Sequence, residues 1–218
     1  VVFAHAGLSS IIPGGFGVTV FFFISGFLIT NLLISEWAHG GINLKNFYMR
    51  RYLRLSPELF FFIALGTFVN LAFFNIRFVD VVAGLFYFTN YLDIVALNRV
   101  ETPFNFSHFW SLAVEEHFYL LVPLLMVAFG RKLQRYTIVI VLICLAVPFY
   151  RWYASLNFFP EHHTGGASAY TYYASEARLD SILYGCLMAM LARFHGNLLP
   201  RLHNSSALAI LLASLAII

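Results

Sequence analysis

Long runs of apolar residues dominate the chain and predict its fold class. A membrane-spanning helix needs about 20 mostly apolar residues. Five stretches meet or approach this length: Phe16–Ser35, Leu55–Phe74, Phe109–Phe129, Tyr136–Tyr153 and Ala177–Phe194. The pattern therefore predicts an all-α protein, a polytopic transmembrane helix bundle.

Basic residues follow the first, third and fifth of these stretches and predict how the bundle is oriented. Short loops rich in Lys and Arg mark the cytoplasmic side of a membrane. All three basic loops can lie on that side only if an even number of crossings separates them. The apolar stretch Val81–Leu92 has only 12 residues between Asp80 and Asp93. We therefore predict a re-entrant segment there, which enters the membrane without crossing it.

Composition excludes two classes of protein. Hydrophobic residues make up 61% of the chain and charged residues 11%, against about 25% charged residues in soluble domains. A water-soluble enzyme is therefore excluded, and so is a disordered chain, because disordered segments are poor in aromatic residues. The net charge of +3 lies in loops, so we expect no nucleic-acid partner. Cys144 and Cys186 lie in apolar runs without a metal or redox motif and are expected to be packed thiols.

The chain starts at Val1 without a methionine and ends in an apolar stretch, Ser206–Ile218. We expect an internal fragment of a longer membrane protein. Residues 1–218 would then form a single transmembrane domain truncated at both ends.

Charged residues inside the predicted spans are the first candidates for chemistry. Each costs about 2.5–3.5 kcal/mol on insertion scales unless it is paired or lies in a polar cavity. The predicted orientation places four of them towards the outer half of the membrane: Glu115, Glu116, Arg178 and Asp180. A structural ion pair, for example between Arg178 and Glu115, would offset the cost. A functional site would do so as well, and both interpretations remain open.

His5 is the side chain best suited to act as a base, because an unperturbed imidazole titrates near pH 6.5. Its predicted depth matches that of Glu115, and a carboxylate can orient a histidine and stabilise its imidazolium form. In a helix, Ser111, Glu115 and Tyr119 share one face, whereas Glu116 points about 100° away. His5 and Glu115 are therefore the predicted catalytic residues.

Aromatic and hydroxyl side chains near Glu115 are candidates for binding substrate. Trp110 and Ser111 directly precede the turn that carries Glu115. An aromatic belt at the membrane surface is the alternative interpretation for Trp110 and Tyr119.

Three arginines form a separate group, which the predicted orientation places at the inner face of the membrane. Arg50, Arg51 and Arg54 cover an arc of about 100° if the segment is helical. Guanidinium groups suit bidentate contacts to phosphate. Positive-inside topology and anionic lipid headgroups are alternative explanations.

Two further patterns carry little functional information. Gly14, Gly15 and Gly17 do not form a dinucleotide fingerprint, because no strand precedes them and the third glycine of that motif is missing. They suit a tight turn and close helix approach. His162 and His163 have no third ligand nearby, so we expect no metal site.

Five parts of the chain together resemble the acyltransferase-3 family of integral-membrane O-acyltransferases. They occur in the order and spacing of that family: His5, Gly14–Leu33, Phe47–Pro57, His108–Pro123 and Ala177–Gly185. The resemblance implies transfer of an acyl group, usually acetyl from cytoplasmic acetyl-CoA, to a hydroxyl of an extracytoplasmic carbohydrate or glycolipid. Acyl-CoA would be the donor substrate, with no bound cofactor. It also implies an integral protein of the bacterial inner membrane, in contact with membrane lipid.

The resemblance also implies roles for single residues. His5 matches an essential histidine of the family, and Glu115 matches the acidic position of a tryptophan-serine-leucine motif. Arg178 matches an arginine late in the domain, and the three arginines of residues 50–54 match an arginine motif. A further family arginine would precede Val1, so part of the site would lie outside this sequence.

These observations give one mechanistic hypothesis and two rivals. In the hypothesis the arginines hold the phosphates of CoA and His5 deprotonates the acceptor hydroxyl. Glu115 orients His5, and Arg178 or Asp180 shapes the polar cavity. A transient acyl-histidine is a second route. A transporter or flippase, with the buried charges along its pathway, is the rival function, although no inverted repeat is recognisable. A purely structural scaffold would leave the cost of the buried charges unexplained.

Overall fold

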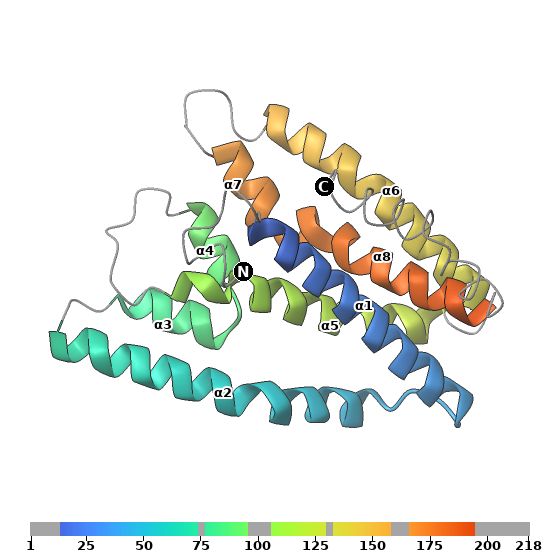
Figure 1. The fold of residues 1–218 in the computed structure, drawn as a ribbon, viewed down its shortest axis with the longest axis horizontal. Helices are drawn as coiled ribbons and strands as arrows, with labels where there is room; N and C mark the ends of the chain where they lie inside the picture. The colour runs from blue at the N-terminus through green and yellow to red at the C-terminus, as the bar shows by residue number, and fades with distance from the viewer. Residues whose placement is uncertain (1–13, 74–76, 96–105, 130–132, 158–165, 195–218) are drawn as a thin grey trace.

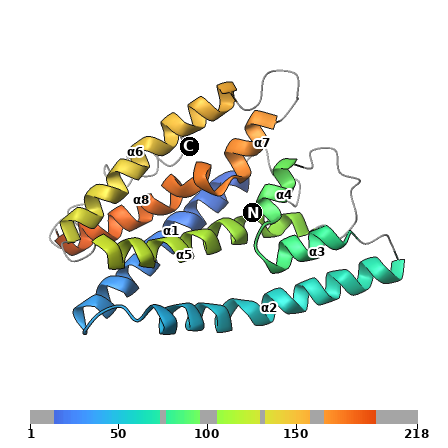
Figure 2. The same cartoon turned by 180° about the vertical axis from the view of Figure 1, so that it is seen from behind.

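The structure is a computed structural model that describes residues 14–73, 77–95, 106–129, 133–157 and 166–194. Within these ranges the chain is helical and contains no strand, which confirms the predicted all-α class (Figures 1 and 2). The helices in chain order are α1 (Gly14–Ala38), α2 (Leu44–Phe73), α3 (Phe78–Leu85), α4 (Thr89–Val95), the 3-10 helix η2 (Phe106–Phe109), α5 (Trp110–Phe129), α6 (Leu133–Asn157), α7 (Gly166–Tyr173) and α8 (Ser175–Phe194).

Four helices of the described part are long and apolar enough to cross a membrane. They are α1, α2, α5 with its preceding 3-10 turn, and α6, which correspond to the first four predicted spans. The fifth predicted span, Ala177–Phe194, forms α8, but α8 is not among these four. Buried residues occur on every side of α8. Because α8 is packed among other helices, it does not need a fully apolar surface. It can therefore carry buried polar residues such as Arg178 and Asp180.

The segment predicted to be re-entrant is built from two short helices. α3 has eight residues and α4 has seven, and neither is long enough to cross a bilayer. The chain turns between them at Tyr87, whose φ of 58° is left-handed. α4 packs beside α5, and α3 lies beside the 3-10 helix that precedes α5 (Figure 2). This helix–turn–helix arrangement fits a segment that does not cross the membrane.

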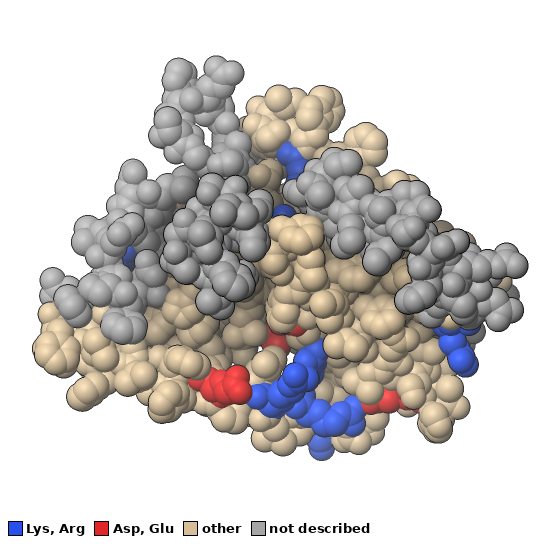
Figure 3. Space-filling view, viewed as in Figure 1, with Lys and Arg blue, Asp and Glu red and all other residues tan. Residues whose placement is uncertain are grey.

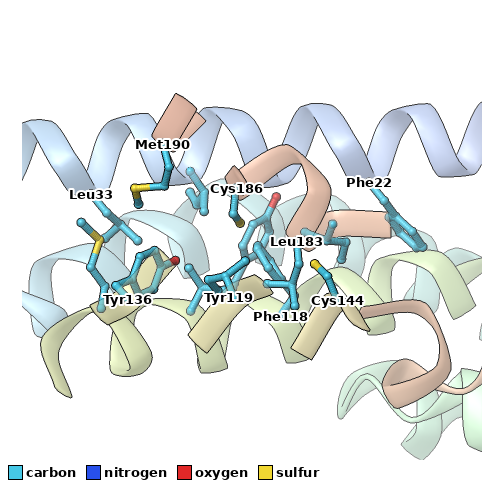
Figure 4. Packing of buried hydrophobic residues seen from close by; sticks show 14 of the residues in the cluster. Phe22, Leu33, Phe118, Tyr119, Tyr136, Cys144, Leu183, Cys186 and Met190 are labelled. Atoms are coloured by element: carbon cyan, nitrogen blue, oxygen red, sulfur yellow. The ribbon is translucent and has the colours of Figure 1, made fainter. Parts of the chain in front are cut away.

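The main hydrophobic core lies between α1, α5, α6 and α8. Side chains from these helices meet in its interior (Figure 4), including those of Phe22, Phe118, Tyr136 and Leu183. Cys144 and Cys186 are free, buried thiols, as the sequence predicts.

The closest helix contact, between α1 and α8, depends on two glycines. A Cβ atom added at Gly26 would overlap the carbonyl oxygen of Ile182, and one added at Gly185 would overlap the carbonyl oxygen of Phe23. The Sγ of Cys186 lies 3.6 Å from the carbonyl oxygen of Gly26. Small residues permit this approach of two backbones, as is common between membrane helices.

We expect Gly185→Ala to destabilise the protein by about 1–3 kcal/mol, because the added methyl group has no space without moving α1. The measurement is the melting temperature of the purified full-length protein in detergent. Gly15→Ala is the matched control, since a Cβ there would lie 3.4 Å from the Tyr172 ring, an ordinary van der Waals contact. Equal melting temperatures for the two variants would contradict the close approach of the α1 and α8 backbones at Gly185.

α2 lies along one edge of the bundle (Figure 1) and packs against it in both halves: Phe47 of the first half belongs to the main core, and the second half forms a smaller cluster. There Leu59 and Ile63 pack against Phe106 in a separate small hydrophobic cluster. In the first half the Tyr48 hydroxyl also donates a hydrogen bond to the Leu120 carbonyl oxygen of α5, at 3.0 Å. This arrangement leaves space between α2, α1 and α5.

Candidate active site

A pocket of about 630 Å³ lies between α1, α2 and α5. Its walls are largely apolar, with Ile24 and Leu28 of α1 among the lining residues. The polar side chains that line it are Ser25, Arg50, Arg51, Arg54, Glu115 and Tyr119. In Figure 3 a group of Lys and Arg side chains lies over this edge of the molecule, beside acidic side chains and below a hollow in the surface. The pocket therefore contains the whole predicted arginine group and the predicted catalytic carboxylate.

Glu115 is held in one orientation by two hydroxyl groups. Its side chain is buried, with 5% of the residue exposed. The Ser25 hydroxyl of α1 donates to Oε1 of Glu115 at 2.5 Å, and the Tyr119 hydroxyl donates to the same oxygen. The Tyr119 contact follows from helical spacing, because residues four apart share a face. Ser25 is a site residue that the sequence analysis missed, since its partner lies 90 residues away.

Arg51 connects the arginine group to this carboxylate. Its guanidinium carbon lies 3.6 Å from the centroid of the Tyr119 ring. Glu115 and the three arginines, which the sequence places at different depths of the membrane, therefore line one pocket. Arg51 is seven residues inside α2, about 10 Å from the start of the helix. This distance carries it to the level of the turn of α5 that contains Tyr119.

The other two arginines have different surroundings. Arg50 forms an ion pair with Glu36 at the end of α1, and its side chain is 55% exposed. Arg54 is exposed, and no acidic side chain of the described residues lies within ion-pair distance of it. All three line the pocket, so the predicted shared face of α2 is correct.

Asp180 is part of an ion pair inside the bundle, between α6 and α8. It is fully buried, and Arg151 donates a hydrogen bond to its Oδ2 at 2.7 Å. Asp180 therefore forms a structural ion pair, one of the two explanations that the sequence left open for the buried charges. Its partner is Arg151 and not a residue of α5. Hydropathy alone does not predict this pair, because it does not show which helix faces α8.

Arg178 packs against an aromatic ring. Its guanidinium carbon lies 4.9 Å from the centroid of the Tyr172 ring, and the residue is 4% exposed. Its Nε is buried and has no hydrogen-bond partner among the described residues. The ion pair between Arg178 and Glu115 that the sequence allowed is absent from the described part. Neither Arg178 nor Asp180 lines the pocket between α1, α2 and α5.

Trp110 and Ser111 do not line that pocket either. Trp110 is 9% exposed and contacts the rings of Phe22, Tyr172 and Tyr173. Ser111 is half-buried at the start of α5. The aromatic-belt interpretation is wrong for Trp110 and Tyr119, because both lie in the core.

A second polar cluster joins α4, α5 and α8. His117 Nδ1 lies 2.7 Å from the Ser175 hydroxyl, which also accepts a hydrogen bond from the Asn90 amide at 3.0 Å. Tyr91 donates to Glu176 at 2.6 Å. Burial, reinforced by Glu176, raises the pKa of Tyr91 to about 12, so its hydroxyl remains a donor. This cluster was not among the sites predicted from the sequence.

Three successive residues of α5 thus have different environments. Glu115 lines the pocket, and His117 contacts α8. Glu116 lies near Tyr87, where burial and then the negative charge of Glu116 raise the tyrosine pKa to about 12. Steps of about 100° per residue explain this divergence.

The predicted catalytic base, His5, lies outside the described residues, as do His162 and His163. The described part of the candidate site therefore consists of the pocket and the groups around Glu115.

Comparisons with known proteins give a consistent result. The family described as "Acyltransferase domain" matches residues 1–218. Peptidoglycan O-acetyltransferase OatA of Listeria monocytogenes serovar 1/2a (strain ATCC BAA-679 / EGD-e) is 29% identical over 84% of this chain and 30% of its own length. O-acetyltransferase OatA of Staphylococcus aureus (strain NCTC 8325 / PS 47) is 33% identical over 83% of this chain and 30% of its own length. The chain thus spans less than a third of these relatives. No solved structure matches it.

Proposed function

The chain belongs to the acyltransferase family that matches its whole length, and from this premise we propose that it is a membrane O-acyltransferase. It takes an acetyl group from cytoplasmic acetyl-CoA and delivers it to a hydroxyl of an extracytoplasmic carbohydrate or glycolipid. The names of the two relatives support O-acetylation, and one of them names peptidoglycan. A bacterial inner membrane is the location that fits this activity, with acetyl-CoA as a substrate and no resident cofactor.

The observation that carries the proposal is the pocket shared by three arginines and a buried carboxylate. Guanidinium groups bind phosphates through charge-assisted, often bidentate hydrogen bonds. A carboxylate fixed by two hydroxyl donors is suited to orient a second catalytic group. A pocket with both features fits a phosphate-bearing thioester better than it fits a transported ion.

In the proposed reaction, His5 removes the proton of the acceptor hydroxyl as the oxygen attacks the thioester carbonyl. The new C–O bond forms, the C–S bond breaks, and the imidazolium of His5 passes its proton to the CoA thiolate, which leaves as the thiol. Glu115 orients the imidazole and stabilises its charged form. A base of this kind contributes about 10²–10⁴-fold to the rate. Attack by His5 itself, through an acyl-histidine, is the second route.

Transfer of radiolabel tests the function and the base together. Membranes that contain the full-length protein are incubated with acetyl-CoA labelled in its acetyl group, and covalent label on envelope carbohydrate is measured. We expect transfer by the natural protein and none by His5→Ala at equal membrane expression. His39→Ala is the control, because His39 is exposed at the end of α1. No transfer by the natural protein would refute the function, and transfer by His5→Ala would refute the role of the histidine.

A further inference from the structure

We infer that Arg51 is a positioning residue, which holds Tyr119 and through it the carboxylate of Glu115, whereas Arg54 is the principal phosphate ligand of the pocket. This inference rests on the proposed function. It divides three arginines that share one helix face into groups with different tasks.

The contacts of Arg51 differ from those of a surface arginine that waits for a ligand. Its guanidinium carbon lies over the Tyr119 ring, 3.6 Å from the centroid. Its Nε is buried and has no hydrogen-bond partner among the described residues. One face of the guanidinium is thus covered by an aromatic ring, a recognised mode of arginine packing.

Arg51 lies at one end of a continuous set of contacts that crosses three helices. From α2, Arg51 covers the ring of Tyr119 on α5. The Tyr119 hydroxyl then donates to Glu115, and Ser25 of α1 donates to the same oxygen of the carboxylate. A shift of the Tyr119 ring would therefore remove one of the two donors that orient Glu115. Arg51 opposes such a shift, because its guanidinium packs on the ring and its own helix is held to the bundle by buried Phe47 and by the hydrogen bond from Tyr48 to Leu120.

The two neighbouring arginines lack this connection. Arg50 is paired with Glu36 in an exposed position. Arg54 is exposed, lines the pocket and has no acidic partner among the described residues. Arg54 can therefore offer all its donors to a phosphate, and Arg50 can do so only by leaving Glu36.

Kinetics of single variants separate the two tasks. The full-length protein is assayed for acetyl transfer over a range of acetyl-CoA concentrations, which gives kcat and KM. For Arg51→Met and Tyr119→Phe we expect kcat to fall about tenfold or more with little change in KM, because an orienting interaction is lost. For Arg54→Met we expect KM to rise about tenfold or more, because ground-state binding is lost. The double variant Arg51→Met with Tyr119→Phe should have a kcat only slightly below that of the less active single variant, since both substitutions act on one carboxylate.

Arg51→Lys distinguishes a positioning role from a loss of folding, because only a positioning role predicts partial recovery of kcat. An ammonium group can rest on the Tyr119 ring, so we expect it to recover part of kcat relative to Arg51→Met. An increase of KM in Arg51→Met equal to that in Arg54→Met, or an unchanged kcat, would overturn the inference. Absence of acetyl transfer by the natural protein would instead refute the proposed function, so the two failures are distinguishable.

Discussion

Glu115→Gln is expected to lower the rate of acyl transfer by about 10²–10⁴-fold, the range by which a supported general base contributes to catalysis. Glutamine has the shape of glutamate, and its amide oxygen can still accept hydrogen bonds from Ser25 and Tyr119. The substitution therefore removes the negative charge while it keeps the packing between α1 and α5. Without that charge, an imidazolium formed during the reaction loses its stabilising partner.

The measurement is kcat for acetyl transfer, with the melting temperature as a check on folding. Glu116→Gln is the matched control, because it makes the same change one residue further along α5. The Oε1 of Glu116 has no hydrogen-bond partner among the described residues, and Glu116 does not line the pocket. We expect Glu116→Gln to keep most of the activity. Equal losses in both variants would mean that negative charge near the pocket matters and the hydrogen-bonded geometry of Glu115 does not.

Arg151→Met is expected to destabilise the bundle by about 3–5 kcal/mol, the cost of removing one partner of a buried ion pair. Asp180 is fully buried, and Arg151 is the group that forms its ion pair. After the substitution, Asp180 would lie between α6 and α8 as an unpaired acid, and burial of an unpaired charge carries a large desolvation cost.

The melting temperature of the full-length protein in detergent reports this loss. The double variant Arg151→Met with Asp180→Leu removes both charges, so we expect it to be much more stable than Arg151→Met alone. Glu36→Gln serves as the comparison, because it breaks the exposed pair with Arg50 and should cost no more than about 1 kcal/mol. A double variant as unstable as Arg151→Met would show that the loss of stability comes from lost packing volume and not from the broken ion pair.

Several features of the molecule follow from the order of residues alone. Of the five apolar stretches predicted to span a membrane, four are helices long and apolar enough to do so, because hydropathy and length depend on neighbouring residues only. Helical spacing correctly placed Tyr119 beside Glu115, and Arg50, Arg51 and Arg54 on one face of α2. These are properties of a single helix, and its period of 3.6 residues is fixed by backbone geometry.

Other features depend on how the helices pack against one another. Ser25 lies 90 residues from Glu115, and Arg151 lies 29 residues from Asp180, yet each pair is in direct contact. Arg51 reaches Tyr119 because the first half of α2 lies beside α5, which also brings the arginines and Glu115 into one pocket. The rotation and crossing of each helix are set by side-chain packing over many residues. No periodic pattern within one helix specifies which residue of a distant helix will meet it.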